Sequence, residues 1–159
     1  MKIQTEKPAT YTTTASQDDA IIARALDILR ARHAAGTTLS NPRDVINYLQ
    51  LQLRGLEHEV FGVITLDAHH HVISMTELSR GTIDGASVYP REVAKHCLSD
   101  NAHRVIFYHN HPSGLAEPST ADRQITEKLV NALALLDIGV LDHLIIGDGS
   151  YSFADNGQI

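Results

Sequence analysis

One stretch of the chain decides its fold, RVIFYHNHPSGLAEPSTAD at residues 104–122. Residues 104–108 form a short run with apolar, β-branched and aromatic members, which predicts a buried strand. Pro112-Ser113-Gly114 then interrupts regular structure. A helix is expected to begin near Ser119, because apolar residues follow at helical spacing. These are Ile125, Leu129, Ala132, Leu133 and Leu136. Strand end, loop and helix start are therefore expected to converge on one point.

Chemistry-bearing side chains stand at that point. His109 and His111 lie two residues apart on a strand-like approach, so both imidazoles are expected on one face. Asp122 falls in the first turn of the expected helix and faces back toward them. Two nitrogens and a carboxylate oxygen form the three-ligand set that catalytic zinc uses, with water as the fourth ligand. A structural zinc site prefers thiolates, and Cys97 is the only cysteine. The sequence predicts one catalytic Zn²⁺ per chain with a bound water.

Each part of this pattern also has an ordinary structural interpretation. Ser119-x-x-Asp122 resembles a capping box, with Ser119 as the N-cap. An isolated His-x-His pair is more often two unremarkable polar residues. Capping is compatible with ligation, and the combination of histidines and aspartate favours a metal site. The run His69-His70-His71 is predicted to be an exposed turn, since consecutive histidines point in different directions.

The complete pattern resembles the motif of the JAMM (MPN+) metalloproteases: His-x-His, seven residues, Ser, two residues, Asp. Residues 109–114 and 118–122 are similar to the RadC branch of that family, as are Gly81-Thr82, residues 89–93 and residues 142–147. The resemblance covers about residues 42–155. It implies an α/β (α+β) fold of the cytidine-deaminase-like kind, a mixed, curved β-sheet flanked by helices.

The resemblance also implies a role for each site residue. His109, His111 and Asp122 would hold zinc, which lowers the pKa of its water toward about 7. A glutamate on an upstream strand would act as general acid/base, and Glu59 is the matching residue, with Glu57 as its competitor. Ser119 would donate to the oxyanion. The implied reaction is hydrolysis of an amide, peptide or isopeptide, in a protein or peptide substrate such as one with a ubiquitin-like tail.

Composition sets the class of protein. The chain has 159 residues, of which 43% are hydrophobic, enough for a globular domain with its own core. No apolar run approaches 18 residues, so no membrane span is predicted. The first 17 residues lack the apolar block of a signal peptide. A single cysteine suits a reducing compartment, and the cytoplasm is the expected location.

Two other functions stay open beside a zinc metallopeptidase. One is a non-catalytic MPN scaffold that keeps the fold and the zinc without turnover. The other is a DNA-repair-associated protein, the traditional label of RadC-like proteins. A formal charge of −6 and a pI of about 5.9 argue against broad nucleic-acid binding, which needs a basic surface. About 40 residues precede the matching part, too few for the helix-hairpin-helix region of full-length members. The oligomeric state is left open.

Three regions are predicted along the chain: a polar tail at 1–17, a helix and linker at 18–40, and the JAMM/MPN domain at 41–159. The helix at 18–33 is expected to pack its apolar face on its own domain. Further helices are expected at 42–53 and 90–98, and further strands at 59–66, 72–78, 140–147 and 151–153. Asp142 or His143 is expected to support the ligand histidines. Cys97 is expected to be at least half-buried and not a nucleophile.

Overall fold

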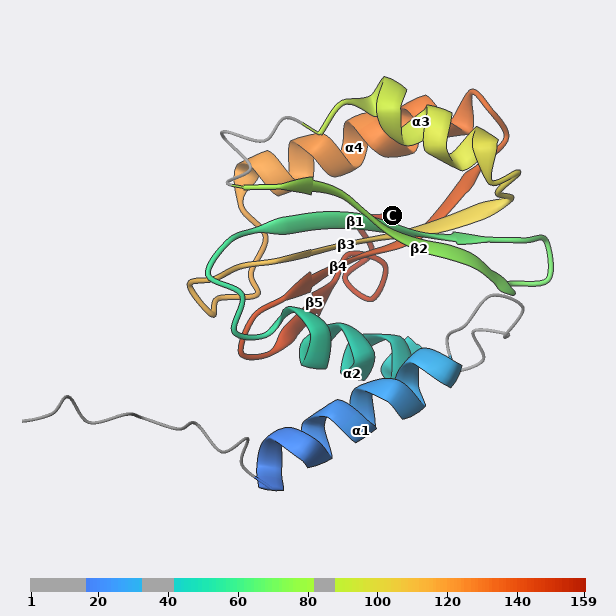
Figure 1. The fold of residues 1–159 in the computed structure, drawn as a ribbon. Helices are drawn as coiled ribbons and strands as arrows, with labels where there is room; N and C mark the ends of the chain where they lie inside the picture. The colour runs from blue at the N-terminus through green and yellow to red at the C-terminus, as the bar shows by residue number, and fades with distance from the viewer. Residues whose placement is uncertain (1–16, 33–41, 82–87) are drawn as a thin grey trace, which may run out of the picture.

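A mixed β-sheet forms the centre of the computed structural model, which describes residues 17–32, 42–81 and 88–159 (Figure 1). Its strands follow the order β2-β1-β3-β4-β5. They are β1 (Val60–Leu66), β2 (Val72–Arg80), β3 (Arg104–Asn110), β4 (Gly139–Ile146) and β5 (Ser150–Ser152). The pair β3–β4 is parallel, and the other neighbouring pairs are antiparallel. This mixed sheet confirms the α+β class expected from the sequence.

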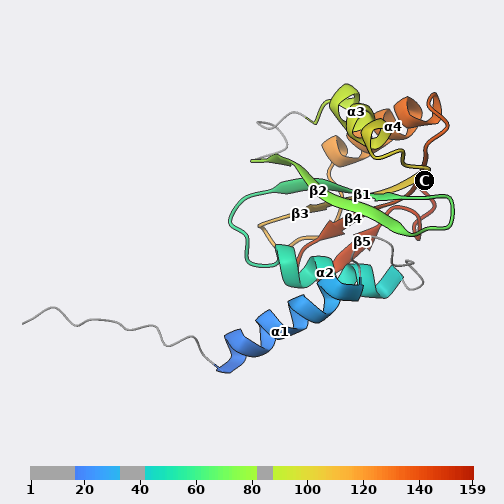
Figure 2. The same ribbon diagram turned by 45° about the vertical axis from the view of Figure 1, so that its right-hand side comes forward.

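Helices cover both faces of the sheet. Helices α3 (Pro90–Ser99) and α4 (Thr120–Ala134) lie on one face, and α2 (Pro42–Leu53) lies on the other (Figures 1 and 2). Helix α1 (Gln17–Arg32) packs on α2, on the side away from the sheet. The expected helices and strands from residue 42 onward agree with these bounds to within two residues, including β3, which continues to Asn110.

Two apolar cores result from this layering. On the α2 face, Leu49 and Leu53 of the helix pack with Ile64 and Tyr108 of the sheet. On the other face, Val93, Cys97, Leu129 and Leu133 of α3 and α4 pack with Val63 and Phe107. Every residue of β1 is buried, because this strand is central and both its faces are covered.

The crossover from β3 through α4 to β4 brings distant residues together. Since β3 and β4 are parallel, their carboxyl ends lie at the same edge of the sheet, where the chain leaves β3 for the loop that leads into α4. The first turn of α4 returns to the end of β3 at this edge, as the sequence predicts. In sheets of this kind, ligand sites form beyond the carboxyl ends of the strands.

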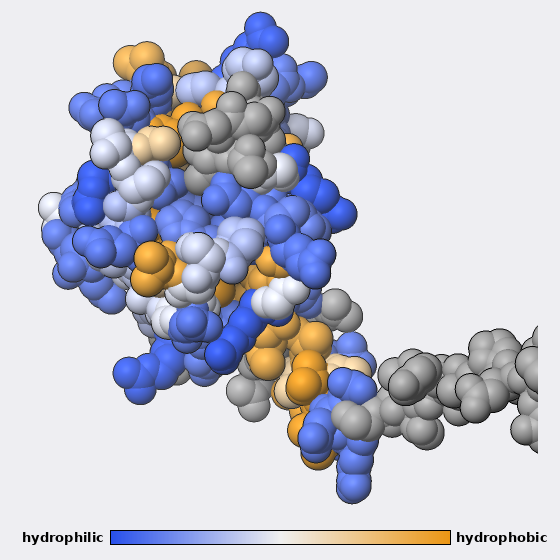
Figure 3. All heavy atoms as spheres, turned by 90° about the vertical axis from the view of Figure 1, so that its left-hand side faces the viewer, coloured by the Kyte–Doolittle hydropathy of each residue, from blue (hydrophilic) through white to orange (hydrophobic). Residues whose placement is uncertain are grey.

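The sequence expectation that α1 packs on its own domain is met in part, since α1 contacts α2 and its Ala25 and Leu26 are half-buried. Two residues of the expected apolar face, Ile21 and Ile22, are nevertheless 61% and 47% exposed, and Ile28 outside that face is 46% exposed. Figure 3 shows apolar atoms gathered on the surface at this end of the molecule. The main neighbour of the helix is α2, and the side chains of Ile21, Ile22 and Ile28 remain largely open to solvent. Gly36, a residue type that can end a helix, lies outside the described residues. None of the described helices is long and apolar enough to cross a membrane.

Candidate metal centre

His109 and His111 stand at the carboxyl end of β3, where the sheet meets the start of α4. His109 is fully buried, and its side chain points to the α4 face with those of Val105 and Phe107, because alternate strand residues share a face. His111 follows the strand directly and is only 12% exposed at its side chain. The Nε2 atoms of the two rings lie 3.0 Å apart. The two imidazoles therefore converge, as the sequence predicts.

Asp122 completes the group from the first turn of α4. Its Oδ1 lies 3.2 Å from His109 Nε2, and its Oδ2 lies 3.4 Å from His111 Nε2. The carboxylate is fully buried. The ligand atoms of all three residues lie within 4.8 Å of one another, close enough to share one ion.

A chain of hydrogen bonds fixes the proton of His109. The hydroxyl of Thr126 donates its proton to the backbone carbonyl of Asp122 at 2.6 Å. Thr126 Oγ1 must therefore accept the proton of His143 Nδ1, which lies 2.6 Å away. Burial and the nearby His109 hold the pKa of His143 well below its usual range, so His143 is neutral and its Nε2 accepts. His109 Nδ1 donates to that nitrogen at 2.8 Å. The lone pair of neutral His109 is therefore on Nε2, facing Asp122.

His111 is oriented in the same sense by the loop that follows it. Its Nδ1 lies 2.6 Å from the backbone carbonyl of Leu115, which can only accept, so Nδ1 carries the proton. The Nε2 atom of neutral His111 then presents its lone pair to His109 and Asp122. Two nitrogen lone pairs and a carboxylate face one another in a buried space.

This arrangement fits a metal cation. Asp122 Oδ1 is buried and makes no hydrogen bond, which is costly for a carboxylate oxygen unless a cation balances it. The ligand atoms are two imidazole nitrogens and one carboxylate oxygen, all of which zinc accepts. Among the residues that the structure describes, no fourth protein ligand joins this cluster, so the set is that of an open site rather than a closed structural one.

The side chains of this cluster shift one another's pKa values. Burial raises the pKa of Asp122, but its contacts with His109 and His111 outweigh burial and lower that pKa far below the usual range. The contact with Asp122 in turn raises the pKa of His111. The buried carboxylate thus favours positive charge at this point, whether a proton or a metal ion provides it.

Ser119 fixes the carboxylate of Asp122 on one side. Its Oγ accepts from the backbone N–H of Asp122 at 3.1 Å and donates to Oδ2 at 2.7 Å, while its own N–H donates to Oδ2 at 2.7 Å. The predicted capping box is therefore present. Because capping uses Oδ2, it leaves Oδ1 available to a cation.

Glu59 lies near the histidines, immediately before β1. It is half-buried, and strand alternation places it on the face of Phe61, whose ring stacks on His109 with centroids 6.2 Å apart. The negative charge of Glu59 contributes to the raised pKa of His111. Its carboxylate therefore acts on the site occupied by the histidines.

Glu57 faces a different part of the surface. It is exposed and lines a cavity of about 210 Å³ between the end of α2, the loop after β3 and the β4–β5 turn. That cavity includes His111 in its lining but neither Asp122 nor Ser119. Glu57 therefore shares a cavity with His111, whereas Glu59 lies on the face of the sheet that carries Phe61 and His109.

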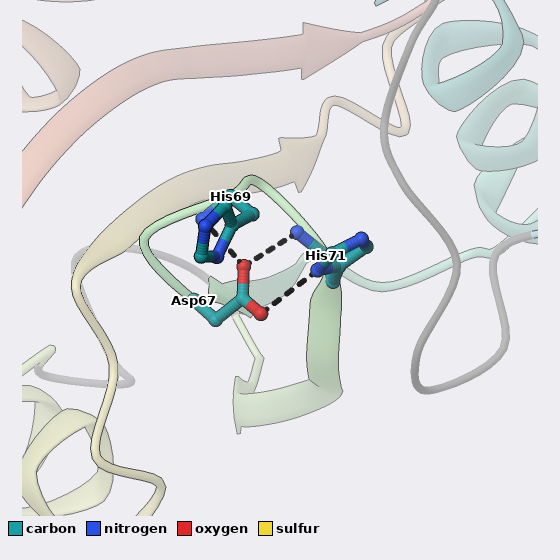
Figure 4. Close-up of side chains that lie close together, drawn as sticks. All are labelled: Asp67, His69 and His71. Atoms are coloured by element: carbon teal, nitrogen blue, oxygen red, sulfur yellow. Dashed lines mark hydrogen bonds and ion pairs between the residues drawn. The ribbon is translucent and has the colours of Figure 1, made fainter.

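A second group of possible ligands lies at the β1–β2 turn, where Asp67, His69 and His71 come together (Figure 4). The sequence analysis did not anticipate a carboxylate beside these histidines. Asp67 Oδ1 accepts the backbone N–H groups of His69 and His71, at 2.7 and 2.9 Å, and Oδ2 pairs with the His71 ring at 2.9 Å. Both oxygens are thus used to close the turn, unlike those of Asp122. This cluster is explained as the exposed turn that the sequence predicts.

Four further residues complete the comparison with the sequence. His143 supports His109 as expected, whereas Asp142 bonds to the backbone N–H groups of His143 and Ala154 and to the Ser152 hydroxyl instead. Cys97 is fully buried, and burial raises the pKa of its thiol to about 11, so it is no nucleophile. Thr126 was missed, although its position four residues after Asp122 places both on one helix face.

Comparisons with known proteins match most of the chain. A family model described as a RadC-like JAB domain matches residues 39–158. A UPF0758 protein of Vibrio cholerae is 51% identical over 139 residues, which cover 87% of this chain and 88% of that protein. UPF0758 proteins of Stutzerimonas stutzeri and Aeromonas hydrophila are 53% and 54% identical over 130 and 125 residues, or 81% and 78% of this chain. The chain spans 58% and 56% of those two relatives.

Proposed function

The chain belongs to the RadC-like JAB domain family, and from that premise we propose that it is a zinc-dependent hydrolase of amide bonds. The observation that carries the proposal is the buried carboxylate of Asp122, whose Oδ1 makes no hydrogen bond and lies 3.2 Å from His109 Nε2, while its Oδ2 lies 3.4 Å from His111 Nε2. His109, His111 and Asp122 would hold the zinc. When bound, zinc supplies Lewis-acid activation of water at neutral pH.

Glu59 would handle the protons of the reaction. Its carboxylate lies close enough to affect the pKa of His111, and it sits at the strand end beside the histidines. We assign it the removal of the water's proton and the delivery of that proton to the leaving amine. General acid–base catalysis of this kind contributes roughly 10²–10⁴-fold.

Ser119 would stabilise the negative charge that develops on the substrate oxygen. Its Oγ is held in place by the backbone N–H of Asp122, while its proton points to Asp122 Oδ2. Rotation of the hydroxyl proton away from Oδ2 makes it available to an oxyanion without moving the oxygen. The substrate of the proposed reaction is a protein or peptide, with a peptide or an isopeptide bond as the target.

The decisive experiment compares Glu59→Gln with Glu57→Gln. Zinc content is measured in both variants and in the wild type, and each protein is incubated with a peptide library and with lysine-linked isopeptide conjugates. New amine groups are then identified by mass spectrometry. We expect zinc in all three proteins and cleavage by the wild type and Glu57→Gln only, with chelation abolishing it and added zinc restoring it.

Two results would overturn the proposal. A wild-type protein that binds no zinc would remove the metal from the mechanism. A zinc-loaded wild type that cleaves neither set of substrates would favour the non-catalytic scaffold. Equal loss in both glutamate variants would remove the specific role of Glu59.

A further inference from the structure

Asn110, between the two histidines of the His-x-His pair, has no part in the proposed chemistry. It is only 2% exposed, and its side chain points to the face of the sheet opposite His109 and His111. A buried amide carries both a donor and an acceptor, and each needs a partner. The partners of this amide lie beside Glu59.

The amide of Asn110 joins two backbone groups, one on each side of Glu59. Its Oδ1 accepts the N–H of Val60 at 2.8 Å, and its Nδ2 donates to the carbonyl of His58 at 3.0 Å. Glu59 is thus the single residue between two anchored positions. A third bond, from Gly81 N–H to the Glu59 carbonyl at 2.9 Å, holds its backbone from β2.

The hydrogen bonds of the Asn110 side chain lie directly beyond the last paired residues of β1 and β3. The pairing of β1 with β3 ends at Phe61 and His109. Beyond that pair, the side chain of Asn110 continues the connection that backbone groups make along the strands. The backbone of Glu59 is therefore fixed relative to the histidines by the residue that lies between them in the sequence.

We propose that Asn110 is a positioning residue, which holds the Glu59 carboxylate at a fixed place beside His111. The catalytic part of this inference rests on the proposed function, whereas the placement of Glu59 does not. Removing the amide frees residues 58–60 from β3 without touching a metal ligand. A displacement of about 1 Å in a reacting group can cost about 10²-fold in rate.

The test uses Asn110→Ala, which loses both hydrogen bonds, and Asn110→Asp, which keeps the acceptor for Val60 N–H and loses the donor to His58. Asn131→Ala is the matched control, because Asn131 is exposed on α4. Cobalt(II) replaces zinc, and pseudocontact shifts of Val60 N–H, Glu59 and Thr126 are measured by NMR. We expect the shifts of Glu59 and Val60 to change in both Asn110 variants and those of Thr126 to stay.

Placement and catalysis are then separated. Zinc affinity is expected to stay unchanged in the Asn110 variants, kcat to fall by about 10²-fold and KM to stay constant. In the Glu59→Gln background, Asn110→Ala is expected to add no further loss, because it acts through Glu59. A loss of stability is expected in either case, because two hydrogen bonds of a buried amide are removed. A merely structural role would also lower zinc affinity and would add to the loss caused by Glu59→Gln.

Unchanged pseudocontact shifts of Glu59 in Asn110→Ala would overturn the inference. It would also be overturned if Asn110→Ala lowered kcat by the same factor in the wild-type and in the Glu59→Gln background. Asn110→Asp provides the same comparison of shifts if Asn110→Ala does not fold. A wild type without amide hydrolysis would refute the proposed function alone, because the cobalt shifts measure the placement of Glu59 without turnover.

Discussion

His109 Nδ1 lies 2.8 Å from His143 Nε2, on two parallel strands that are adjacent in the sheet but separated by a helix in the sequence. His143 in turn contacts Thr126 on that helix. One hydrogen-bonded chain therefore connects β3, β4 and α4 behind the candidate metal centre. Partners of this kind orient metal-binding histidines and raise their basicity.

Thr126→Val is expected to weaken zinc binding by roughly 10–100-fold, because it removes the hydroxyl that fixes the tautomer of His143 and, through it, His109. Thr126→Ser keeps the hydroxyl and is the control. Zinc affinity is measured by competition with a chromophoric chelator. Equal zinc affinity in Thr126→Val and Thr126→Ser would show that the hydrogen bonds from Thr126 through His143 do not determine the tautomer of His109.

Substitutions of Ser119 separate its capping role from its proposed catalytic role. Ser119→Ala is expected to destabilise the protein by about 1 kcal/mol, whereas Ser119→Gly costs only a few tenths, since glycine is tolerated at N-caps. Both lose the hydroxyl, so both are expected to lower kcat by about 10²-fold on a cleaved substrate. Denaturant unfolding gives the stabilities. If kcat fell in Ser119→Ala but not in the more stable Ser119→Gly, the role of Ser119 would be capping alone.

Local signals in the sequence were sufficient to predict the components of the centre. Period-two alternation gave His109 and His111 a common face, and the capping pattern put Asp122 in a first helical turn. These features depend on residues close together in the chain. Local patterns of this kind predict which side chains converge without any information on contacts between distant elements.

The supporting bonds were predicted only in part, because the sequence left open whether Asp142 or His143 supports the ligand histidines and gave no partner for Asn110. The contact of His143 with His109 depends on the parallel register of β3 and β4, and the bonds of Asn110 depend on how β1 ends against β3. Neither register is determined by a local pattern. For Leu136, helical spacing predicted a place on the apolar face, but α4 ends at Ala134 and Leu136 is 39% exposed.

Acid is expected to weaken the β1–β2 turn through Asp67. The N–H and ring of His71 lower the pKa of Asp67 from 3.8 to about 2. A carboxyl with a lowered folded-state pKa stabilises the fold above its unfolded pKa, and this stabilisation is lost as the pH falls through about 2. Asp67→Ala should therefore be less stable than the wild type at pH 5, with the difference shrinking toward pH 2. Urea unfolding at both pH values measures it; a constant difference would contradict the prediction.

Gly62→Ala is expected to disturb the sheet beside the metal centre. Gly62 pairs with Tyr108 across β1 and β3, and a Cβ at Gly62 would overlap the phenol ring of Tyr108. That ring is buried in the core on the α2 face, so the overlap must move packed groups, which typically costs about 1–3 kcal/mol.

Because Tyr108 immediately precedes His109, the same displacement is expected to reduce zinc affinity as well as stability. Gly149→Ala is the matched control, since a Cβ there meets no atom within 4 Å. Thermal unfolding of the metal-free proteins and chelator competition measure the two effects. If Gly62→Ala matched Gly149→Ala in both measurements, the Tyr108 ring would have to yield without strain, and the packing of β1 against β3 would not control the position of His109.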